Sequence, residues 1–358
     1  MRTFIATLAA AMVEASAHGE MAEIHRPIEM WIDGVLTTKY IASDICRGSG
    51  YNLICPENGR AYIVNKPNFD IKEPDFFAPN LLNSSIEWDV DLKEHDCGCM
   101  NAFFTVSMPG RKETGDLDLQ DGYFYCDATV GKHGGEFCPE LDLMKANKHG
   151  WETSVHTCDE PDENGHYEDC DGDGDMYLRM NSKTWLKGKL GPDSETIDTN
   201  KPFHIRIDLE EKDGQLSGIK TIFSQEGRFA TMHDLNADYL NNMSAALKNG
   251  QVFVLSNWSG DGKEELDEDQ CSGKQTCSAY QTMISNIRVT RPVIPPFNPD
   301  DYEWSGGHCA NKTDDLCGRM NCPSAEHCKW SWIKGGDWND PTAQCRCNVV
   351  VGPVKFIQ

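Results

Sequence analysis

Long hydrophobic segments are missing from this chain of 358 residues. Its main apolar run, Phe4 to Val13, is too short to cross a bilayer, which takes about 20 apolar residues. Arg2 precedes this run and Ala15-Ser16-Ala17 follows it, and a basic residue, a short apolar segment and small residues are the parts of a secretory signal peptide. We therefore expect residues 1–17 to be removed, and the mature protein, from His18, to be secreted and to contact no membrane.

Basic residues are also scarce. Lys and Arg number 33 against 57 Asp and Glu, which gives a net charge of −24. A surface this acidic repels the phosphates of nucleic acids and of anionic lipids. The composition therefore argues against a nucleic-acid partner, and it is compatible with a neutral partner such as a polysaccharide.

Cysteine, by contrast, is abundant. Of the 16 cysteines, ten lie between Cys46 and Cys277 and six between Cys309 and Cys347. Even numbers in a secreted chain indicate disulfide bonds, and each region can close its own, although sequence leaves the pairing open. Sites of the form Asn-x-Ser/Thr fit the same secretory route and lie at Asn83, Asn242, Asn257 and Asn311.

Helical periodicity is rare in the first 293 residues, whereas short strand-like segments are frequent. Ile86 to Leu92 alternates apolar and polar residues, as a half-buried strand does. Further strand candidates are Ala102 to Met108, Phe203 to Leu209, Ile219 to Ser224, Val252 to Ser256 and Met283 to Val289. The best helix candidate is Asp234 to Leu247. Many strands separated by Gly-, Asp- and Asn-rich loops predict a two-sheet sandwich.

Prolines mark a boundary near residue 293. We expect one large domain at 18–293, a Pro-rich linker at 294–304 and a small C-terminal module at 305–358. The module is rich in cysteine and contains Trp330, Trp332 and Trp338. In an oxidising compartment its cysteines indicate disulfides rather than zinc. Its tryptophans have two interpretations: a strip that stacks on sugar rings, or the module's own minimal core.

The segment Glu140-Leu141-Asp142-Leu143-Met144-Lys145-Ala146-Asn147 carries the most chemistry. It resembles the catalytic strand of the family 7 glycoside hydrolases, cellobiohydrolases and endoglucanases that cut β-1,4-glucan, in which the pattern is Glu-x-Asp-x-x-Glu-Ala-Asn. Other segments resemble the family in the same order: Cys97 to Met108, Tyr125-Cys126-Asp127, His156-Thr157-Cys158-Asp159, Ile197 to Phe203, Leu247 to Trp258 and Ile284 to Val289. The resemblance therefore extends from about Leu81 to Val289.

The resemblance implies an all-β fold: a concanavalin A-like β-jelly roll sandwich with a concave substrate groove, to which the small disulfide-rich module is added. It implies a β-glucan partner and a monomer, and no cofactor or metal. Asp169 to Asp175 begins like a calcium loop, but Met180 stands where that loop needs Glu, so we interpret it as an acidic turn. The loop between Cys126 and Cys138 is shorter than in tunnel-forming members, which predicts an open groove.

The resemblance also implies roles for individual residues. Glu140 corresponds to the nucleophile of a retaining mechanism, and Asp142 corresponds to its hydrogen-bonded supporter. His156 matches a family histidine close to these carboxylates, and we interpret it as a structural hydrogen-bond partner; it or His149 is the alternative proton source. Trp258 matches a tryptophan on which a glucosyl ring stacks, and a core position is the equally supported alternative.

Lys145 is the departure with the largest consequence, because it occupies the acid/base position. Residues i and i+2 of a strand share a face, so position 145 joins Glu140 and Asp142 only if a β-bulge lies between them. A retaining glycosidase needs two carboxyl groups roughly 5–5.5 Å apart, and a lysine, with an ordinary pKa of about 10.4, is a weak acid. We expect Lys145 to pair with Glu140 and hold it ionised, or, if burial lowers its pKa, to donate a proton.

Two classes of function therefore stay open. The first is a secreted hydrolase of β-1,4-glucan whose activity is weakened by the loss of the acid/base Glu. The second is a catalytically inactive relative that binds cellulose-like glycan. An aryl cellobioside, whose leaving group needs no proton, discriminates between them.

Overall fold

The computed structural model describes residues 27–67, 71–118, 123–175, 186–259, 266, 277, 279 and 281–291, and the backbone of short strands between 302 and 349. The chain divides into two units, Met1–Arg291 and Pro292–Gln358. In the second unit, β19 (Tyr302–Ser305) pairs with β20 (His308–Asn311), and β21 (Cys328–Trp330) pairs with β22 (Cys347–Val349). The predicted signal peptide, the linker up to residue 301 and the side chains of the module lie outside the described residues.

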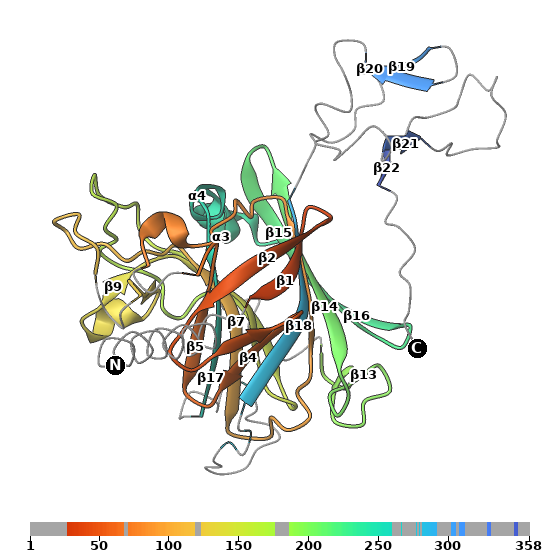
Figure 1. Cartoon of the computed structure of the whole chain (residues 1–358), viewed down its shortest axis with the longest axis horizontal. Helices are drawn as coiled ribbons and strands as arrows, with labels where there is room; N and C mark the ends of the chain where they lie inside the picture. Colours follow the sequence, from red (N-terminus) through yellow and green to blue (C-terminus); the bar gives the residue numbers. More distant parts are fainter. Residues whose placement is uncertain are drawn as a thin grey trace, which may run out of the picture. The chain divides into compact units, whose positions relative to one another are not determined.

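The first unit is built from two layers of β-strands (Figure 1). The first layer has the order β11-β10-β7-β17-β5-β2. Its strands are β2 (Val35–Ala42), β5 (Gly59–Val64), β7 (Cys99–Val106), β10 (Glu140–Ala146), β11 (Trp151–His156) and β17 (Val252–Ser259). All pairs within this layer are antiparallel.

The second layer has the order β1-β18-β6-β14-β15-β16, and the β1–β2 pair connects it to the first. Its strands are β1 (Ile28–Ile32), β6 (Ser85–Val90), β14 (Phe203–Lys212), β15 (Gln215–Gln225), β16 (Arg228–Asp234) and β18 (Gln281–Thr290), with β4 (Asn52–Pro56) on β18 and β3 (Arg47–Ser49) on β4. Short elements connect the strands: β8 (Cys126–Asp127), β9 (Glu136–Phe137), β12 (Leu190–Gly191), β13 (Ile197–Asp198), η1 (Glu73–Asp75) and η3 (Val130–His133).

Each predicted strand is present, with boundaries shifted by a few residues. The predicted helix is also present, as α3 (Ala237–Leu240), η4 (Asn241–Met243) and α4 (Ser244–Asn249). It begins at Ala237 because Asp234 still belongs to β16. None of the helices in the described part of the chain is long and apolar enough to cross a membrane.

Aromatic side chains join the two layers. Trp88 of β6 lies edge-on to Phe103 of β7, with ring centroids 5.2 Å apart. Trp151 of β11 stacks on Trp88 at 6.3 Å and meets Phe223 of β15 at 4.9 Å. Such pairs contribute about 0.5–1.5 kcal/mol each beyond the burial of their area. They fix β11 against the second layer, and β11 carries part of the site described below.

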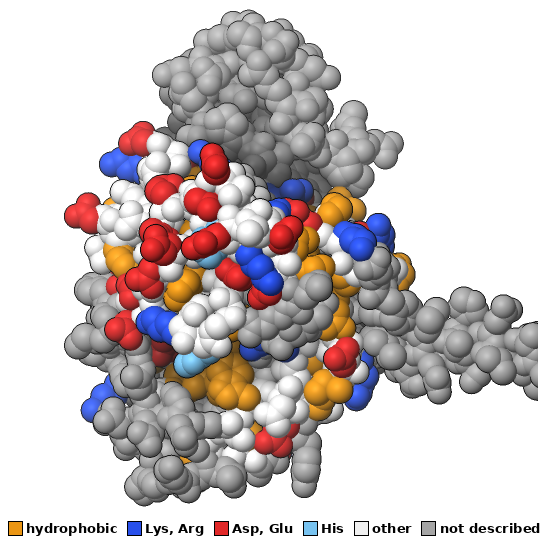
Figure 2. Space-filling view, turned by 90° about the vertical axis from the view of Figure 1, so that its left-hand side faces the viewer, with side chains coloured by type: hydrophobic (Ala, Val, Ile, Leu, Met, Phe, Trp, Pro, Cys, Tyr) orange, Lys and Arg blue, Asp and Glu red, His pale blue; other side chains and the backbone are white. Residues whose placement is uncertain are grey.

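Disulfide bonds anchor the loops at the ends of these strands. The described pairs are Cys46–Cys55, Cys99–Cys277, Cys126–Cys138 and Cys158–Cys170. Cys97 is also disulfide-bonded. Cys138 lies just before β10 and Cys158 just after β11, so both ends of the candidate site are held covalently. Figure 2 shows Asp and Glu side chains spread over the described part of one face, in keeping with the net charge.

Candidate active site

β10 places Glu140 and Asp142 on one face of the first layer, and the intervening Leu141 belongs to the core between the layers. The register of β10 shifts between Asp142 and Lys145 against β11, and between Asp142 and Met144 against β7. This is the bulge that the spacing of the motif predicts. It brings Lys145 onto the same face, which we call the groove face.

Asp142 is the centre of the polar contacts on this face, and it is fully buried. Its Oδ2 lies 2.5 Å from Nζ of Lys145 and 3.0 Å from Nε2 of His156, and it accepts a hydrogen bond of 3.0 Å from Ser154 Oγ. Burial alone would raise the pKa of Asp142, but the Lys145 ammonium and the His156 hydrogen bond outweigh it and hold this pKa well below its ordinary value. Asp142 is therefore a carboxylate at neutral pH.

Glu140 is in the opposite state. Its Oε2 accepts a hydrogen bond of 3.2 Å from the backbone N–H of Ala128, and 6 % of the residue is exposed. Burial and then the negative charge of Asp142 raise its pKa, and the charges of Lys145 and His156 offset only part of this, so that the pKa is about 8. At neutral pH Glu140 keeps its proton.

The expected ion pair between Lys145 and Glu140 is thus wrong. Lys145 pairs with Asp142, because the bulge places its side chain beside the residue three positions back rather than five. The expectation that burial brings Lys145 toward neutrality is also wrong. Burial lowers its pKa, but the charges of Asp142, Glu140 and Glu152 raise it further, and the net pKa lies above the ordinary value. Lys145 is a fixed cation and a very weak acid.

His156 is held in place from both ring nitrogens. Nδ1 donates to the backbone carbonyl of Asp171 at 3.1 Å, while Nε2 faces Asp142. Gly174 is required here, because a Cβ at this position would lie 2.7 Å from Cε1 of His156. The side chain of Asp171 accepts hydrogen bonds from the backbone N–H of Gly174 and from the Tyr239 hydroxyl. The acidic turn thus positions His156. Burial lowers the pKa of His156, but its contacts with Asp142 raise it overall.

His149, the other histidine considered from the sequence, does not join this cluster. Its Nε2 lies 2.7 Å from Oδ1 of Asp96, and Lys148 Nζ lies 2.5 Å from the other oxygen of the same carboxylate. Burial would raise the pKa of Asp96, but these two contacts hold it far below its ordinary value. The structure therefore places His149 with Asp96, beyond the end of β10.

A row of side chains crosses the groove face at the level of Lys145. Register pairs Glu152 on β11 with Lys145, Lys145 with Ala102 on β7, Ala102 with Ser256 on β17, and Ser256 with Arg60 on β5. Arg60 donates from Nε to Ser256 Oγ at 3.2 Å. Sequence reasoning missed Arg60 and Glu152. Glu152 could have been found, because Glu152, Ser154 and His156 alternate along one strand and must share a face.

The β5 end of this row opens into a pocket of about 680 Å³. Its lining includes Arg60, Ser256 and the aromatic side chains of Tyr62, Tyr123 and Trp258. Trp258 is half-buried and packs against a cluster that contains Tyr62. Trp258 therefore contributes both to the packing beneath the groove face and to the wall of a pocket.

Asn257, next to Trp258, is among the residues around this pocket but is fully buried, at 0 % exposure. Attachment of a glycan requires a surface position. The sequon at Asn257 is therefore not usable in the folded protein, and glycan does not crowd the groove at this point.

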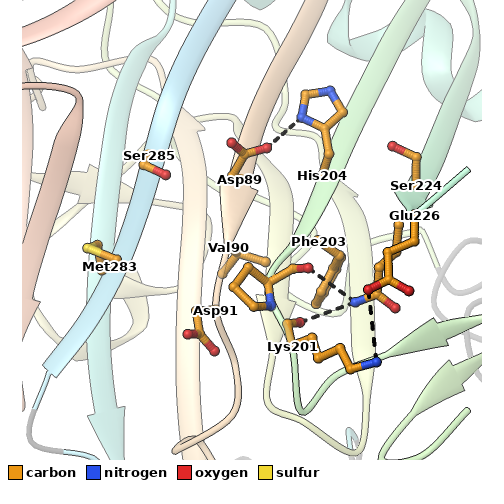
Figure 3. Close-up of a pocket in the computed structure, with 12 residues that line it drawn as sticks. Asp89, Val90, Asp91, Lys201, Phe203, His204, Ser224, Glu226, Met283 and Ser285 are labelled. Atoms are coloured by element: carbon orange, nitrogen blue, oxygen red, sulfur yellow. Dashed lines mark hydrogen bonds and ion pairs between the residues drawn. The ribbon is translucent and has the colours of Figure 1, made fainter. Parts of the chain in front are cut away.

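A second pocket lies on the outer face of the second layer, beside β6 and β14 (Figure 3). Here Asp89 Oδ1 lies 2.7 Å from Nδ1 of His204, and Asp89 Oδ2 accepts a hydrogen bond of 2.6 Å from Asn286. The hydrogen bonds that His204 donates to Asp89 and Glu87 raise the pKa of His204 to about 9. These charged groups form ion pairs and hydrogen bonds with one another across neighbouring strands. We therefore interpret them as surface pairs that stabilise the sheet, and not as a ligand site.

No family model matches the sequence. Among solved structures, the chain is similar to a native endocellulase of Humicola insolens, with a TM-score of 0.60 and 16 % identity over 75 % of this chain and 97 % of that one. It is also similar to a family 7 cellobiohydrolase from Daphnia pulex (TM-score 0.54, 16 % identity, 75 % and 96 % covered). A third is a cellobiohydrolase from Melanocarpus albomyces in complex with cellotetraose (0.53, 15 %, 75 % and 96 %).

At these identities the similarity establishes the fold. The first unit has the β-jelly roll of the family 7 cellobiohydrolases and endoglucanases, as the resemblance of the catalytic strand implies. The sequence has diverged far from these structures, to about 16 % identity.

The raised pKa of Glu140 leads to a first expected result. Between the unfolded value of about 4.3 and the folded value of about 8, the folded protein keeps a proton that the unfolded chain has lost. Stability therefore falls as pH rises through this window. Glu140→Gln removes the titration, so its free energy of unfolding, relative to wild type, should rise with pH by on the order of 5 kcal/mol across the window. Guanidinium denaturation at a series of pH values measures this free energy.

Glu94→Gln is the control, because the Glu94 side chain is 78 % exposed. If the free energy of unfolding changed with pH in the same way for both variants, the raised pKa of Glu140 would be contradicted.

Proposed function

We propose that this protein is secreted and binds β-1,4-glucan along the groove face, and that hydrolysis by the usual double displacement through Glu140 is strongly weakened. One observation carries the proposal: Lys145 is ion-paired with Asp142 on the groove face, and Glu140 is buried beside the same carboxylate, where burial and the charge of Asp142 raise its pKa to about 8. Double displacement requires an ionised nucleophile and a second carboxyl group that first donates and then accepts a proton. At neutral pH Glu140 is not ionised, and Lys145 supplies no carboxyl.

The fold and the pocket beside Arg60 support glucan as the ligand. One similar structure is an endoglucanase complexed with cellobiose (TM-score 0.58, 17 % identity), and another is the cellobiohydrolase with cellotetraose. The pocket combines three aromatic rings with a guanidinium and a hydroxyl. Aromatic faces suit the C–H side of a sugar ring, while polar groups bond its hydroxyls. The disulfides support the secretory route.

A second candidate is a glucan-binding protein without any catalysis. It is favoured by the three donors that converge on Asp142, which stabilise the inactive charge state. Release of reducing ends from amorphous cellulose and mixed-linkage β-glucan separates the candidates, with the bound fraction measured in the same tubes and Glu140→Gln as the control. Release that disappears in the control establishes slow hydrolysis. Binding without release establishes the binding protein, and absence of both would refute the proposal.

Trp258 gives the binding half of the proposal its own test. Trp258→Ala removes an aromatic face from the pocket wall, and we expect the affinity for cellohexaose to fall about tenfold, equivalent to about 1.4 kcal/mol. Trp31→Ala is the matched control, because Trp31 lies on β1 of the second layer, beside Arg288. Isothermal titration calorimetry measures both variants. Equal losses of affinity in the two would place the glucan elsewhere.

A further inference from the structure

The sequon Asn242-Met243-Ser244 lies on the surface, at the point where η4 continues into α4. Asn242 is exposed, and its side chain makes no hydrogen bond or ion pair within the described part of the chain. On either side of it, Leu240 and Met243 are fully buried and belong to the core between the layers. The core thus fixes the backbone of this turn, while the Asn242 side chain faces solvent and has room for a bulky group.

The other two sequons of the first unit have structural explanations. Asn257 is fully buried. Asn83 is half-buried, and its Nδ2 lies 3.5 Å from Oε2 of Glu211. Its backbone has a φ of 60°, a left-handed conformation that asparagine adopts more readily than most residues. The fold therefore accounts for the asparagine at positions 83 and 257, whereas it gives Asn242 no structural task.

Ser244, the third residue of the exposed sequon, is buried. It is 4 % exposed, and its Oγ accepts a hydrogen bond of 2.8 Å from the backbone N–H of Leu216 on β15. A sequon requires both the asparagine and the hydroxyl of the third residue, so the enzyme that attaches the glycan must reach both. In the folded protein it can reach Asn242 but not Ser244. Attachment at this site must therefore precede the docking of η4 and α4 on β15.

We propose, on the basis of the secretory route above, that Asn242 carries an N-linked glycan, attached before this part of the chain folds. Nδ2 of Asn242 forms a bond to the anomeric carbon of an oligosaccharide and loses one proton to solvent. The bond from that carbon to the phosphate of a lipid-diphosphate donor breaks, and its electron pair stays on the phosphate oxygen. The glycan leaves the candidate active site open, because Asn242 does not line the pocket beside Arg60.

Peptide mass spectrometry of the full chain, secreted from a eukaryotic host, tests the proposal. Enzymatic removal of N-glycans in heavy-oxygen water converts each glycosylated asparagine to an aspartate that carries the heavy oxygen. We expect this mark at Asn242 and at neither Asn83 nor Asn257. Asn242→Gln should lose the mark, and the intact protein should lose the mass of one glycan. Asn241→Gln is the matched control, because it changes the neighbouring residue and keeps the sequon, so it should retain the glycan.

The order of attachment and folding has its own measurement. Detergent-opened microsomes, which contain the transferase and its lipid-linked donor, should modify Asn242 in the reduced, unfolded chain and leave it bare in the folded, unglycosylated protein. Equal modification of the two would overturn this order.

The remaining outcomes separate the inference from the proposed function. A secreted protein with a bare Asn242 would overturn the inference and leave the proposed function standing. Retention of the wild-type protein inside the host, without glycan at any of the three asparagines, would refute the proposed secretion and the inference with it.

Discussion

Lys145→Glu is expected to release reducing ends from soluble β-1,4-glucan at least about a hundredfold faster than the wild-type protein, the lower end of what a general acid contributes. The substitution has two effects. It supplies a carboxyl at the acid/base position, and it removes the cation that lies 2.5 Å from Asp142. The new carboxyl gives its proton to the glycosidic oxygen and then accepts one from water, as the retaining route requires. The product should then be the β anomer, as in a retaining reaction.

Two further variants separate these effects. Lys145→Gln removes the cation without adding a carboxyl, so it should gain little activity on glucan. The double variant Lys145→Glu, Glu152→Gln removes the like charge that would face the new carboxyl across the strands, and it should keep the gain. Reducing-end assays at neutral pH measure all of them. Equal rates for Lys145→Glu and Lys145→Gln would mean that the groove is defective beyond this one position.

Asp142→Asn is expected to lower the free energy of unfolding by about 3–5 kcal/mol, the usual cost of leaving one partner of a buried ion pair alone. Asp142 is completely buried, while 24 % of the Lys145 side chain is exposed, so the lysine gains partial compensation from solvent. Chemical denaturation at neutral pH measures the loss. Asp208→Asn is the matched control, because Asp208 pairs with Arg206 at 2.8 Å in a more exposed setting, where about 1 kcal/mol or less is expected.

The free energy of unfolding at acid pH provides an independent test of the ion pair between Asp142 and Lys145. The folded pKa of Asp142 lies below its unfolded value of about 3.9. Its stabilising contribution is therefore complete above the unfolded value and is lost as pH falls toward the folded one. Asp142→Asn should show a shallower loss of stability with falling pH than the wild type does. A loss no larger than that of Asp208→Asn at neutral pH would contradict the role given to this ion pair.

Burial and the charge of Asp142 together keep the proton on Glu140. Glu140 and Asp142 lie on one face of β10 and titrate as a pair, and Lys145 and His156 stabilise the carboxylate of Asp142, whose charge then adds to the effect of burial on Glu140. The bulge assigns the cation to Asp142. The protonated state of Glu140 is the reason for proposing that the presence of Glu140 alone does not make this chain an active retaining enzyme.

Much of the scaffold follows from local patterns. Alternation identifies β6 at Ile86 to Leu92, because one face of that strand is buried against the other layer. The spacing between Asp142 and Lys145 predicts a bulge, because without one the two side chains point to opposite faces. These predictions succeed because they depend on strand geometry alone, which neighbouring residues determine.

The partner of Lys145 could not be predicted in the same way. A lysine side chain is long enough to reach either Glu140 or Asp142, so the choice depends on where the bulge lies and on His156 and Ser154 from the next strand. Glu152 was missed for a related reason. Its proximity to Lys145 is a matter of register between β10 and β11, and register depends on the turn between them and on tertiary packing.

Labelling of Glu140 tests the central claim most directly. A fluorinated cellobioside with a dinitrophenolate leaving group needs no acid, and it traps a carboxylate nucleophile as a stable glycosyl ester that intact-protein mass spectrometry detects. At about pH 6 we predict little adduct on the wild-type protein, whose Glu140 keeps its proton, and labelling that speeds up as pH rises through about 8. Labelling of the wild-type protein as fast at about pH 6 as at about pH 9 would show that Glu140 is already ionised below neutral pH, and would contradict this account.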